Sequence, residues 1–165
     1  MEEERTILDR AQIQEIIPHR EPFVFVDRIV EVEFGRMAVG ILDDFEKTQH
    51  KFWVKGHFPR FPVIPGAILL EALAEVGAVA ALGLPENRGK IAMLTGVDRW
   101  RFRHVAIPGR HIRLEAQLTR VRKNYGTGHV KAYTPGEPVL AEGNLSFAIL
   151  DTPSALAEDL PTEEP

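Results

Sequence analysis

The chain has 165 residues, 44% of them hydrophobic, and a formal net charge of −4. This length fits one domain with its own core. Because the sequence contains no cysteine, disulfides, thiolate nucleophiles and thiolate metal sites are excluded.

The acidic charge is concentrated at the end of the sequence. Five of the 24 acidic residues lie in 151–165, which has three prolines and no lysine or arginine, so residues 1–150 carry a net charge of +1. We therefore expect one domain over 1–150 and an acidic, disordered tail over 151–165. The first residues lack the pattern of a secretory signal, and prolines and glutamates interrupt the apolar run 61–85. These features predict a cytoplasmic protein without membrane insertion.

Three elements are predicted before residue 50. Asp9 can cap a short helix near 10–17, which Pro18 should end because the residue before a proline avoids helical backbone. Residues 23–30 and 36–42 are rich in β-branched side chains and predict the two strands of a hairpin.

A long helix is predicted near 66–83. Pro65 suits the start of a helix, and Gly83 lies where a C-terminal cap belongs. The residues between them are apolar on all sides, which is typical of a buried helix.

Four further strands are predicted after this helix, and we expect them to form an antiparallel meander. They are residues 90–102, 111–122, 127–134 and 138–150. A flat sheet would leave Ile68 or Val76 of the helix in water, so sheet curvature, a second subunit, or both must cover them. The predicted fold class is α+β, with a strongly curved antiparallel sheet wrapped around one long central helix.

Two acids interrupt the apolar helix. An ionised carboxylate at Glu71 must be paired, hydrogen-bonded or protonated, and any of these states can serve catalysis. Glu75 follows four positions later and falls on the same stripe as Ala67 and Ala78. The alternative is that this stripe simply touches solvent.

His57 lies in a segment rich in proline and glycine, where catalytic side chains are common, although most single histidines are structural. The six histidines form no helical i, i+4 pair and no ligand motif, so we expect no metal. Gly66, at the helix start, offers backbone N–H groups at the positive end of the helix dipole, which would stabilise an oxyanion. A base, an acid and an oxyanion donor thus fall within residues 56–75.

Arginines alternate with aromatic residues near the end of the first strand after the helix. In a strand, Arg99, Arg101 and Arg103 would share one face, and Trp100 and Phe102 the other. This pattern indicates either an ordinary solvated face or a basic patch for an acidic partner. We expect no nucleic acid partner, since the body is nearly neutral and no nucleic-acid motif is present.

Three motifs, in order and spacing, resemble the hot-dog-fold 3-hydroxyacyl-acyl-carrier-protein dehydratases of type II fatty acid synthesis. They are IIPHREPFVFVDRI (16–29), GHFPRFPVIPGAILLEALAE (56–75) and LTGVDRWRFRHVAIPGRHIRLEAQL (94–118). The similarity covers roughly residues 10–150. It implies syn dehydration of a (3R)-3-hydroxyacyl thioester on acyl carrier protein to the trans-2-enoyl thioester, without cofactor or metal.

The resemblance also implies roles for individual residues. His57 would abstract the C2 proton, Glu71 would protonate the departing hydroxyl, and the Gly66 N–H would hold the thioester carbonyl. Phe58, Val63, Ile91 and Met93 match acyl-tunnel positions, and Arg99, Arg101 and Arg103 would meet the carrier protein. The histidine and glutamate would come from opposite subunits of a homodimer, often assembled as a trimer of dimers.

The sequence departs from the family pattern near these residues. Arg60 and Phe61 replace a usual Gly-Arg pair, Arg110 replaces an acid, and Glu75 replaces a glutamine and adds a second acid that would modulate the acid-base balance of the site. Two alternatives remain, because the same fold also hosts other functions. They are a hot-dog acyl thioesterase and a non-catalytic acyl-binding dimer.

Overall fold

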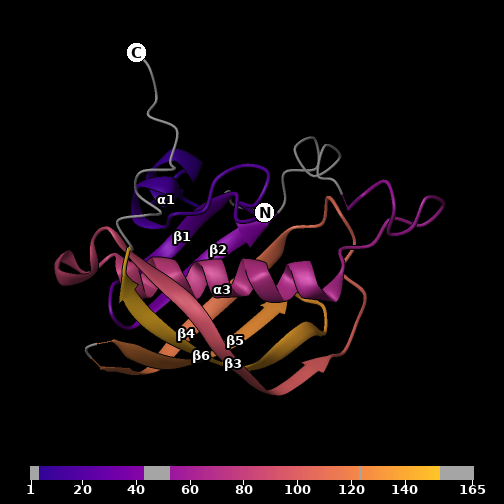
Figure 1. Ribbon diagram of the computed structural model, residues 1–165. Helices are drawn as coiled ribbons and strands as arrows, with labels where there is room; N and C mark the ends of the chain where they lie inside the picture. Colours follow the sequence, from indigo (N-terminus) through magenta and orange to yellow (C-terminus); the bar gives the residue numbers. More distant parts are fainter. Residues whose placement is uncertain (1–3, 43–52, 123, 153–165) are drawn as a thin grey trace.

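A six-stranded antiparallel sheet curves around one long helix, α3 (Gly66–Leu82), in the computed structural model (Figure 1). The structure describes residues 4–42, 53–122 and 124–152. The predicted α+β class with a wrapped central helix, the hot-dog fold, is confirmed. The predicted tail, apart from its first two residues, lies outside the described residues.

The helix α3 begins and ends where the sequence predicts. Pro65 occupies its N-cap and Gly83 its C-cap. Its last carbonyls are bonded, because the Gly35 N–H donates to the oxygen of Ala80 and the Asn87 amide donates to that of Ala81, both at 2.8 Å. From Ala72 onward all but one of its residues are buried, which confirms the prediction of a buried helix.

A short helix, α1 (Arg10–Ile16), precedes the sheet and confirms the first predicted element. Asp9 accepts the Gln12 N–H at 2.9 Å, and the Gln12 side chain accepts the Asp9 N–H in return, a capping box. Ile17 is the C-cap and already has extended backbone, as expected before Pro18.

The predicted hairpin forms, but its first strand starts later than expected. Strand β1 (Arg28–Glu33) pairs with β2 (Met37–Leu42). The prediction that residues 23–27 belong to the strand was wrong. The N–H groups of Phe25 and Val26 donate to a side chain of α3 rather than to a neighbouring strand.

The last four strands are β3 (Lys90–Phe102), β4 (Ile112–Arg122), β5 (Tyr125–Tyr133) and β6 (Val139–Asp151). A short 3-10 turn, η1 (Pro85–Asn87), leads into β3. The sheet order is β1-β2-β4-β5-β6-β3. The meander is confirmed for β4, β5 and β6 and wrong for β3, which pairs with β6 at the far edge. Chain order misleads here because β2 takes the place beside β4.

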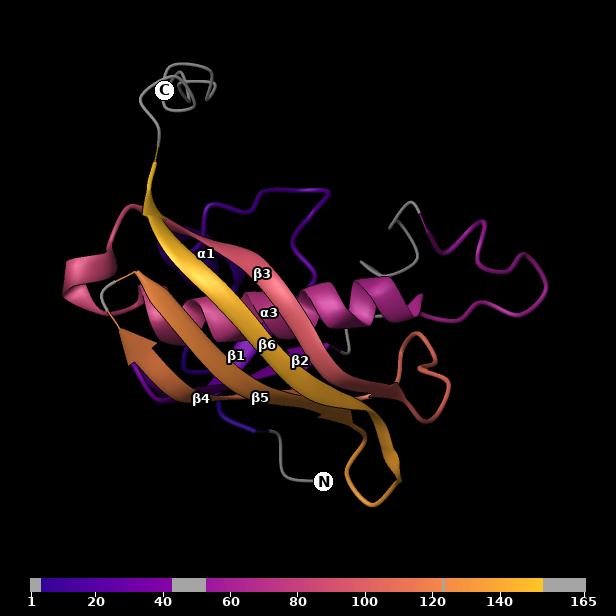
Figure 2. The same cartoon turned by 60° about the horizontal axis from the view of Figure 1, so that its bottom comes forward.

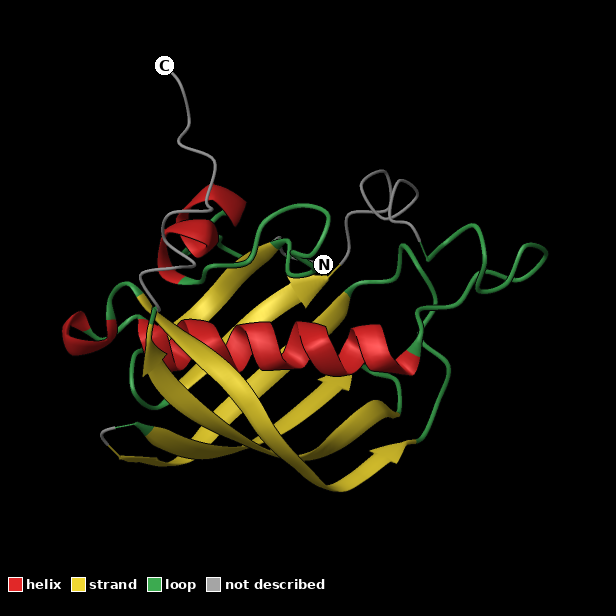
Figure 3. Ribbon diagram, viewed as in Figure 1, coloured by secondary structure: helices red, strands yellow, loops and turns green. Residues whose placement is uncertain are grey.

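The curvature of the sheet covers most of the helix, which contacts all six strands (Figures 2 and 3). Buried and half-buried positions alternate along β4 and β6, so one face of the sheet forms the core. Gly40 on β2 permits a close approach, since a Cβ there would lie 2.7 Å from Val76 of α3. The segment between α1 and β1 also lies against α3, where the N–H groups of Phe25 and Val26 bond to a side chain of the helix (Figure 1).

The alternation expected near Arg99 is interrupted. Arg99 has a φ of 51°, and the pairing of β3 with β6 shifts register between Asp98 and Arg101. Such a bulge breaks the regular two-residue period. The rings of Trp100 and Phe102 nevertheless contact each other, with centroids 5.6 Å apart, as expected for residues that share a face. No helix within the described residues is long and apolar enough to cross a membrane.

Candidate active site

An apolar cavity of about 270 Å³ lies between the middle of α3 and the sheet. Ala74, Gly77 and Ala78 bound it on the helix side. Side chains from the strands complete its wall, namely Ala92, Met93, Leu94, Leu118, Gly128, Val130, Leu145 and Phe147. Its ionisable lining residues are Glu71 and His19. A mostly apolar wall with one polar corner suits a ligand that joins an alkyl chain to a polar reacting group.

At this polar corner, His19 contacts Glu71. The Nε2 of the imidazole lies 3.3 Å from Oε1 of Glu71, and both side chains are about three-quarters buried, at 22% and 26% exposure. The hydrogen bond with Glu71 raises the pKa of His19, while burial opposes this by lowering it. His19 was not predicted as a site residue, although it stands within the first family motif. Nothing in its local pattern indicates a partner on a distant helix.

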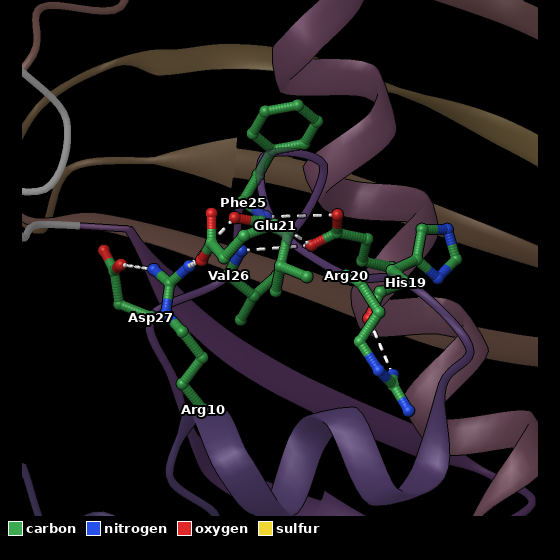
Figure 4. A network of polar contacts seen from close by, with 9 residues as sticks. Arg10, His19, Arg20, Glu21, Phe25, Val26 and Asp27 are labelled. Atoms are coloured by element: carbon green, nitrogen blue, oxygen red, sulfur yellow. Dashed lines mark hydrogen bonds and ion pairs between the residues drawn. The ribbon is translucent and has the colours of Figure 1, made fainter. Parts of the chain in front are cut away.

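Glu75, one turn after Glu71, is the fully buried acid, with 1% exposure. The N–H groups of Phe25 and Val26 donate to its Oε2 at 2.9 and 3.0 Å, and these bonds appear as dashed lines in Figure 4. Burial raises the pKa of Glu75 to about 7, although the two backbone N–H donors lower it. Glu75 therefore changes charge near neutral pH, next to the candidate site.

The stripe that carries these acids is graded in exposure. Ala67 is exposed, Glu71 is largely but not fully buried, and Glu75 and Ala78 are buried. The alternative that the stripe simply touches solvent therefore applies to its first residue. The two carboxylates reach protein partners on the segment before β1.

His57 belongs to the loop that leads into α3. This loop projects beyond the N-terminal end of the helix (Figure 1). Its Nδ1 is 3.2 Å from the carbonyl oxygen of Val63, and its ring stacks on Phe58 with centroids 4.2 Å apart. His57 is not among the residues that line the cavity. A single chain therefore does not place His57 in the cavity beside Glu71.

Gly66 forms the first turn of α3, and no side-chain hydrogen bond caps this end at Pro65. The N–H groups of the first residues of α3 point out of the helix, at the positive end of its dipole. A Cβ at Gly66 would lie 2.7 Å from the ring of Phe102, so this ring packs directly on the glycine. Phe102 is itself 57% exposed.

Of the four residues expected in an acyl tunnel, Met93 lines the cavity. Ile91 does not, although its neighbour Ala92 does. Phe58 and Val63 belong to the His57 loop and lie outside the cavity; Phe58 is exposed and Val63 buried. The departures from the family pattern, Arg60 and Phe61, are exposed on the same loop.

The three arginines differ in their surroundings. Arg99 and Arg101 are exposed, and Arg101 donates to the neighbouring carbonyl of Trp100. Arg103 lies just past the end of β3 and pairs with Glu142, its Nε 2.7 Å from Oε1. Arg99 also has a carboxylate neighbour, since its Nε lies 3.6 Å from Oδ2 of Asp98, but both of these side chains are largely exposed.

Among the described residues, one group could hold a metal ion. His19, Glu71 and Glu75 each offer a ligand atom, and these atoms lie within 4.8 Å of one another. The oxygens of Glu75 already accept backbone N–H groups.

Comparisons with known proteins agree with this architecture. The family described as the FabA-like domain matches residues 17–141. A 3-hydroxyacyl-[acyl-carrier-protein] dehydratase FabZ from Thermomicrobium roseum is 50% identical over 149 residues, covering 90% of this chain and 97% of that protein. The protein of the same name from Pelotomaculum thermopropionicum is 47% identical over 143 residues, covering 87% of this chain and 99% of that one.

Solved structures show the same fold at low sequence identity. The dehydratase heterocomplex ApeI:P from Xenorhabdus doucetiae superposes with a TM-score of 0.69 at 15% identity, covering 96% of this chain and all of that one. A putative thioesterase from Silicibacter gives a TM-score of 0.58 at 16% identity, over 90% and 96% of the two chains. The wrapped helix, with an acid at one end of an apolar cavity, is thus that of a hot-dog-fold protein.

Within that class, extensive identity over nearly full length decides the family. The chain belongs to the FabA-like family, among the 3-hydroxyacyl-acyl-carrier-protein dehydratases.

Proposed function

We propose that this enzyme dehydrates (3R)-3-hydroxyacyl-acyl carrier protein to trans-2-enoyl-acyl carrier protein in fatty acid synthesis. The observation that carries the proposal is Glu71, an acid at the polar corner of a largely apolar cavity, in a chain 50% identical to a protein named for this reaction. The cavity accepts the alkyl chain, and the reacting carbons lie at Glu71.

In the proposed reaction, two side chains share the proton transfers. His57 removes a proton from C2, and Glu71 gives a proton to the C3 hydroxyl, which leaves as water while the C2–C3 double bond forms. The thioester carbonyl takes up charge as the C2 proton leaves. The Gly66 N–H at the start of α3 stabilises this charge, with Phe102 moved aside.

A second copy of the chain supplies the missing half of the site in this proposal. His57 does not line the cavity of its own chain, and the loop that carries it extends beyond the start of α3, so in this proposal it reaches the cavity of a partner (Figure 1). The edge strand β3 supports a homodimer, because it exposes Met93, Leu94 and Val97. An apolar, unpaired edge of this length is a natural site for pairing with another copy. We also propose that these dimers assemble further into a trimer of dimers.

The exposed Arg99 and Arg101 fit the acidic carrier protein. Both lie near the end of β3, where the Phe102 ring covers the start of α3. A carrier bound there would deliver its acyl thioester toward Gly66. The basic charge would speed association and make it sensitive to salt.

Product analysis tests the proposed reaction. Purified protein is incubated with 3-hydroxyacyl-acyl carrier protein and the products are followed by mass spectrometry. We expect the acyl carrier protein substrate to lose one water while its thioester stays intact. Release of free carrier thiol without an enoyl product would identify a thioesterase, and binding without turnover at any chain length would identify an acyl-binding dimer.

A further inference from the structure

The environment of His19 points to a role that the proposed reaction leaves unassigned. Its imidazole lies close to two carboxylates of α3, with Nε2 3.3 Å from Oε1 of Glu71 and a ring nitrogen within 4.8 Å of a carboxylate oxygen of Glu75. Glu75 lies in the buried layer behind the cavity, whereas Glu71 opens onto it. The three groups therefore form one compact cluster, of which Glu71 and His19 line the cavity.

We propose that His19 is the positioning residue of Glu71, and that the buried carboxylate of Glu75 maintains the positive charge of His19. This inference rests on the proposed dehydration. When Glu71 gives its proton to the C3 hydroxyl, negative charge develops on Glu71. A charged imidazole at hydrogen-bond distance stabilises that charge and fixes the direction of the carboxyl group.

Glu75 can act in this way because its own geometry is fixed. The N–H groups of Phe25 and Val26 hold its buried carboxyl group in place. Those bonds favour the ionised form against the cost of burial, and the pKa of Glu75 settles at about 7. In the ionised form Glu75 attracts the imidazolium, and this adds to the effect of Glu71 in raising the pKa of His19.

The other charges near His19 are directed elsewhere. Arg20 would repel an imidazolium, but its guanidinium donates to the carbonyls of Gln14 and Ile17. It also donates to the carbonyl of His19 (Figure 4). Arg10 of α1 pairs with Glu21 and Asp27. From the strands, the cavity presents apolar side chains and glycine to this corner. Glu71 and Glu75 are therefore the carboxylates that set the charge of His19.

The substitution Glu75→Gln tests the proposal, because it replaces one carboxylate oxygen by an amide nitrogen of similar size. Glu75→Gln keeps an oxygen that can accept the N–H groups of Phe25 and Val26, but it removes the negative charge. Glu86→Gln removes an exposed carboxylate on η1, away from this cluster, and serves as the matched control. His19→Gln keeps a hydrogen-bond donor near Glu71 and removes the titratable imidazole.

The first measurement is an NMR titration of the histidine rings, with the His19 signal assigned from its absence in His19→Gln. Glu75→Gln should lower the pKa of His19 by about one unit, and Glu86→Gln should leave it unchanged. An unchanged His19 midpoint in folded Glu75→Gln would overturn the proposal. This titration needs no turnover, so it decides the charge relationship even if the dehydration assay fails.

The second measurement is the pH dependence of kcat. Loss of the imidazolium should set an alkaline limb, and Glu75→Gln should move that limb to lower pH by the same amount as the NMR midpoint. In the His19→Gln background, Glu75→Gln should have no further effect on the limb. A limb that moves equally with and without His19 would show that Glu75 acts by another route.

Discussion

The Nε2 of His19 lies 3.3 Å from Oε1 of Glu71, which joins the loop before β1 to the middle of α3. This contact turns the acid toward the cavity and gives it a partner that a helical pattern alone would not provide. It also ties the reacting corner to the segment that caps Glu75 with two N–H groups. Catalysis and the packing of the 18–27 segment are therefore expected to respond together to changes here.

Removing either proposed proton-transfer group should abolish most of the dehydration. His57→Ala and Glu71→Gln are expected to lower kcat about a thousandfold, because positioned acids and bases contribute factors of this order. The rate is measured as enoyl product formed from carrier-bound substrate. His104→Ala changes an exposed histidine and should keep the wild-type kcat. A fully active Glu71→Gln would remove Glu71 from the mechanism.

Mixing the two inactive variants tests whether each site draws on two subunits. A mixed dimer of His57→Ala and Glu71→Gln subunits would contain one site with both native groups and one with neither. After unfolding and refolding of an equal mixture, about a quarter of the wild-type rate should return, because random pairing makes half the dimers mixed. If activity stays at the level of the separate variants, His57 and Glu71 act within one chain.

The buried Glu75 should make stability fall as pH rises toward neutrality. In the folded chain its pKa is raised to about 7 from an ordinary value of 4.5, so folding takes up a proton between these pH values. Its stabilising contribution is complete below pH 4.5 and is lost as pH rises through 7. Glu75→Gln should therefore match wild type near pH 4.5 and exceed it by up to about 3 kcal/mol at pH 8.

Urea unfolding at several pH values measures this difference, with Glu86→Gln as a control that should follow wild type. Parallel pH profiles for wild type and Glu75→Gln would mean that the carboxyl of Glu75 ionises at its ordinary pKa in the fold.

Gly40 should be hard to replace, because β2 passes so close to α3. Its Cβ in Gly40→Ala would lie 2.7 Å from Val76 and 2.9 Å from Val26, both buried. We expect a loss of about 2 kcal/mol in the free energy of unfolding. Gly77→Ala is the matched comparison, because its new Cβ would meet Ala116 at an ordinary 3.8 Å. That variant should gain about 0.5 kcal/mol from helix propensity, and equal effects at both glycines would contradict the close approach.

The exposed arginines should govern carrier recognition without touching the chemistry. Arg99→Glu combined with Arg101→Glu is expected to raise KM for carrier-bound substrate about tenfold at low salt and leave kcat unchanged. A short acyl thioester lacking the carrier protein should show no such change. Arg120→Glu reverses an exposed charge on β4 and serves as the control. If Arg120→Glu raised KM as much as the Arg99→Glu and Arg101→Glu pair, the effect would come from the net charge of the protein and not from a carrier-binding surface.

The sequence predicted where the helices and strands lie along the chain better than it predicted which strands are neighbours in the sheet. Pro65 and Gly83 marked both ends of α3, and β3 was placed over 90–102, the residues it occupies. The position of β3 beside β6 could not be predicted, because pairing across a sheet depends on which edge is free after β2 has joined β4. Local pattern contains no such information.

The candidate site was predictable to a similar degree. Glu71 and Gly66 stood out from an apolar helix and its first turn. The buried acid was Glu75 rather than Glu71, because the N–H groups that accommodate it come from Phe25 and Val26, far away in the chain. His19 was missed for the same reason, since a histidine after a helix end has no local sign of its partner.

The order of the strands also governs when the chain can finish folding. Strand β3 emerges directly after the helix, yet among the described strands its partner is β6, the last of all. During synthesis, β3 therefore stays without this partner until β4, β5 and then β6 have been made. Long-range pairing of this kind slows folding and leaves strands exposed in the meantime. A nascent chain halted before Val139 would therefore present β3 unpaired to whatever chaperone or neighbouring chain meets it first.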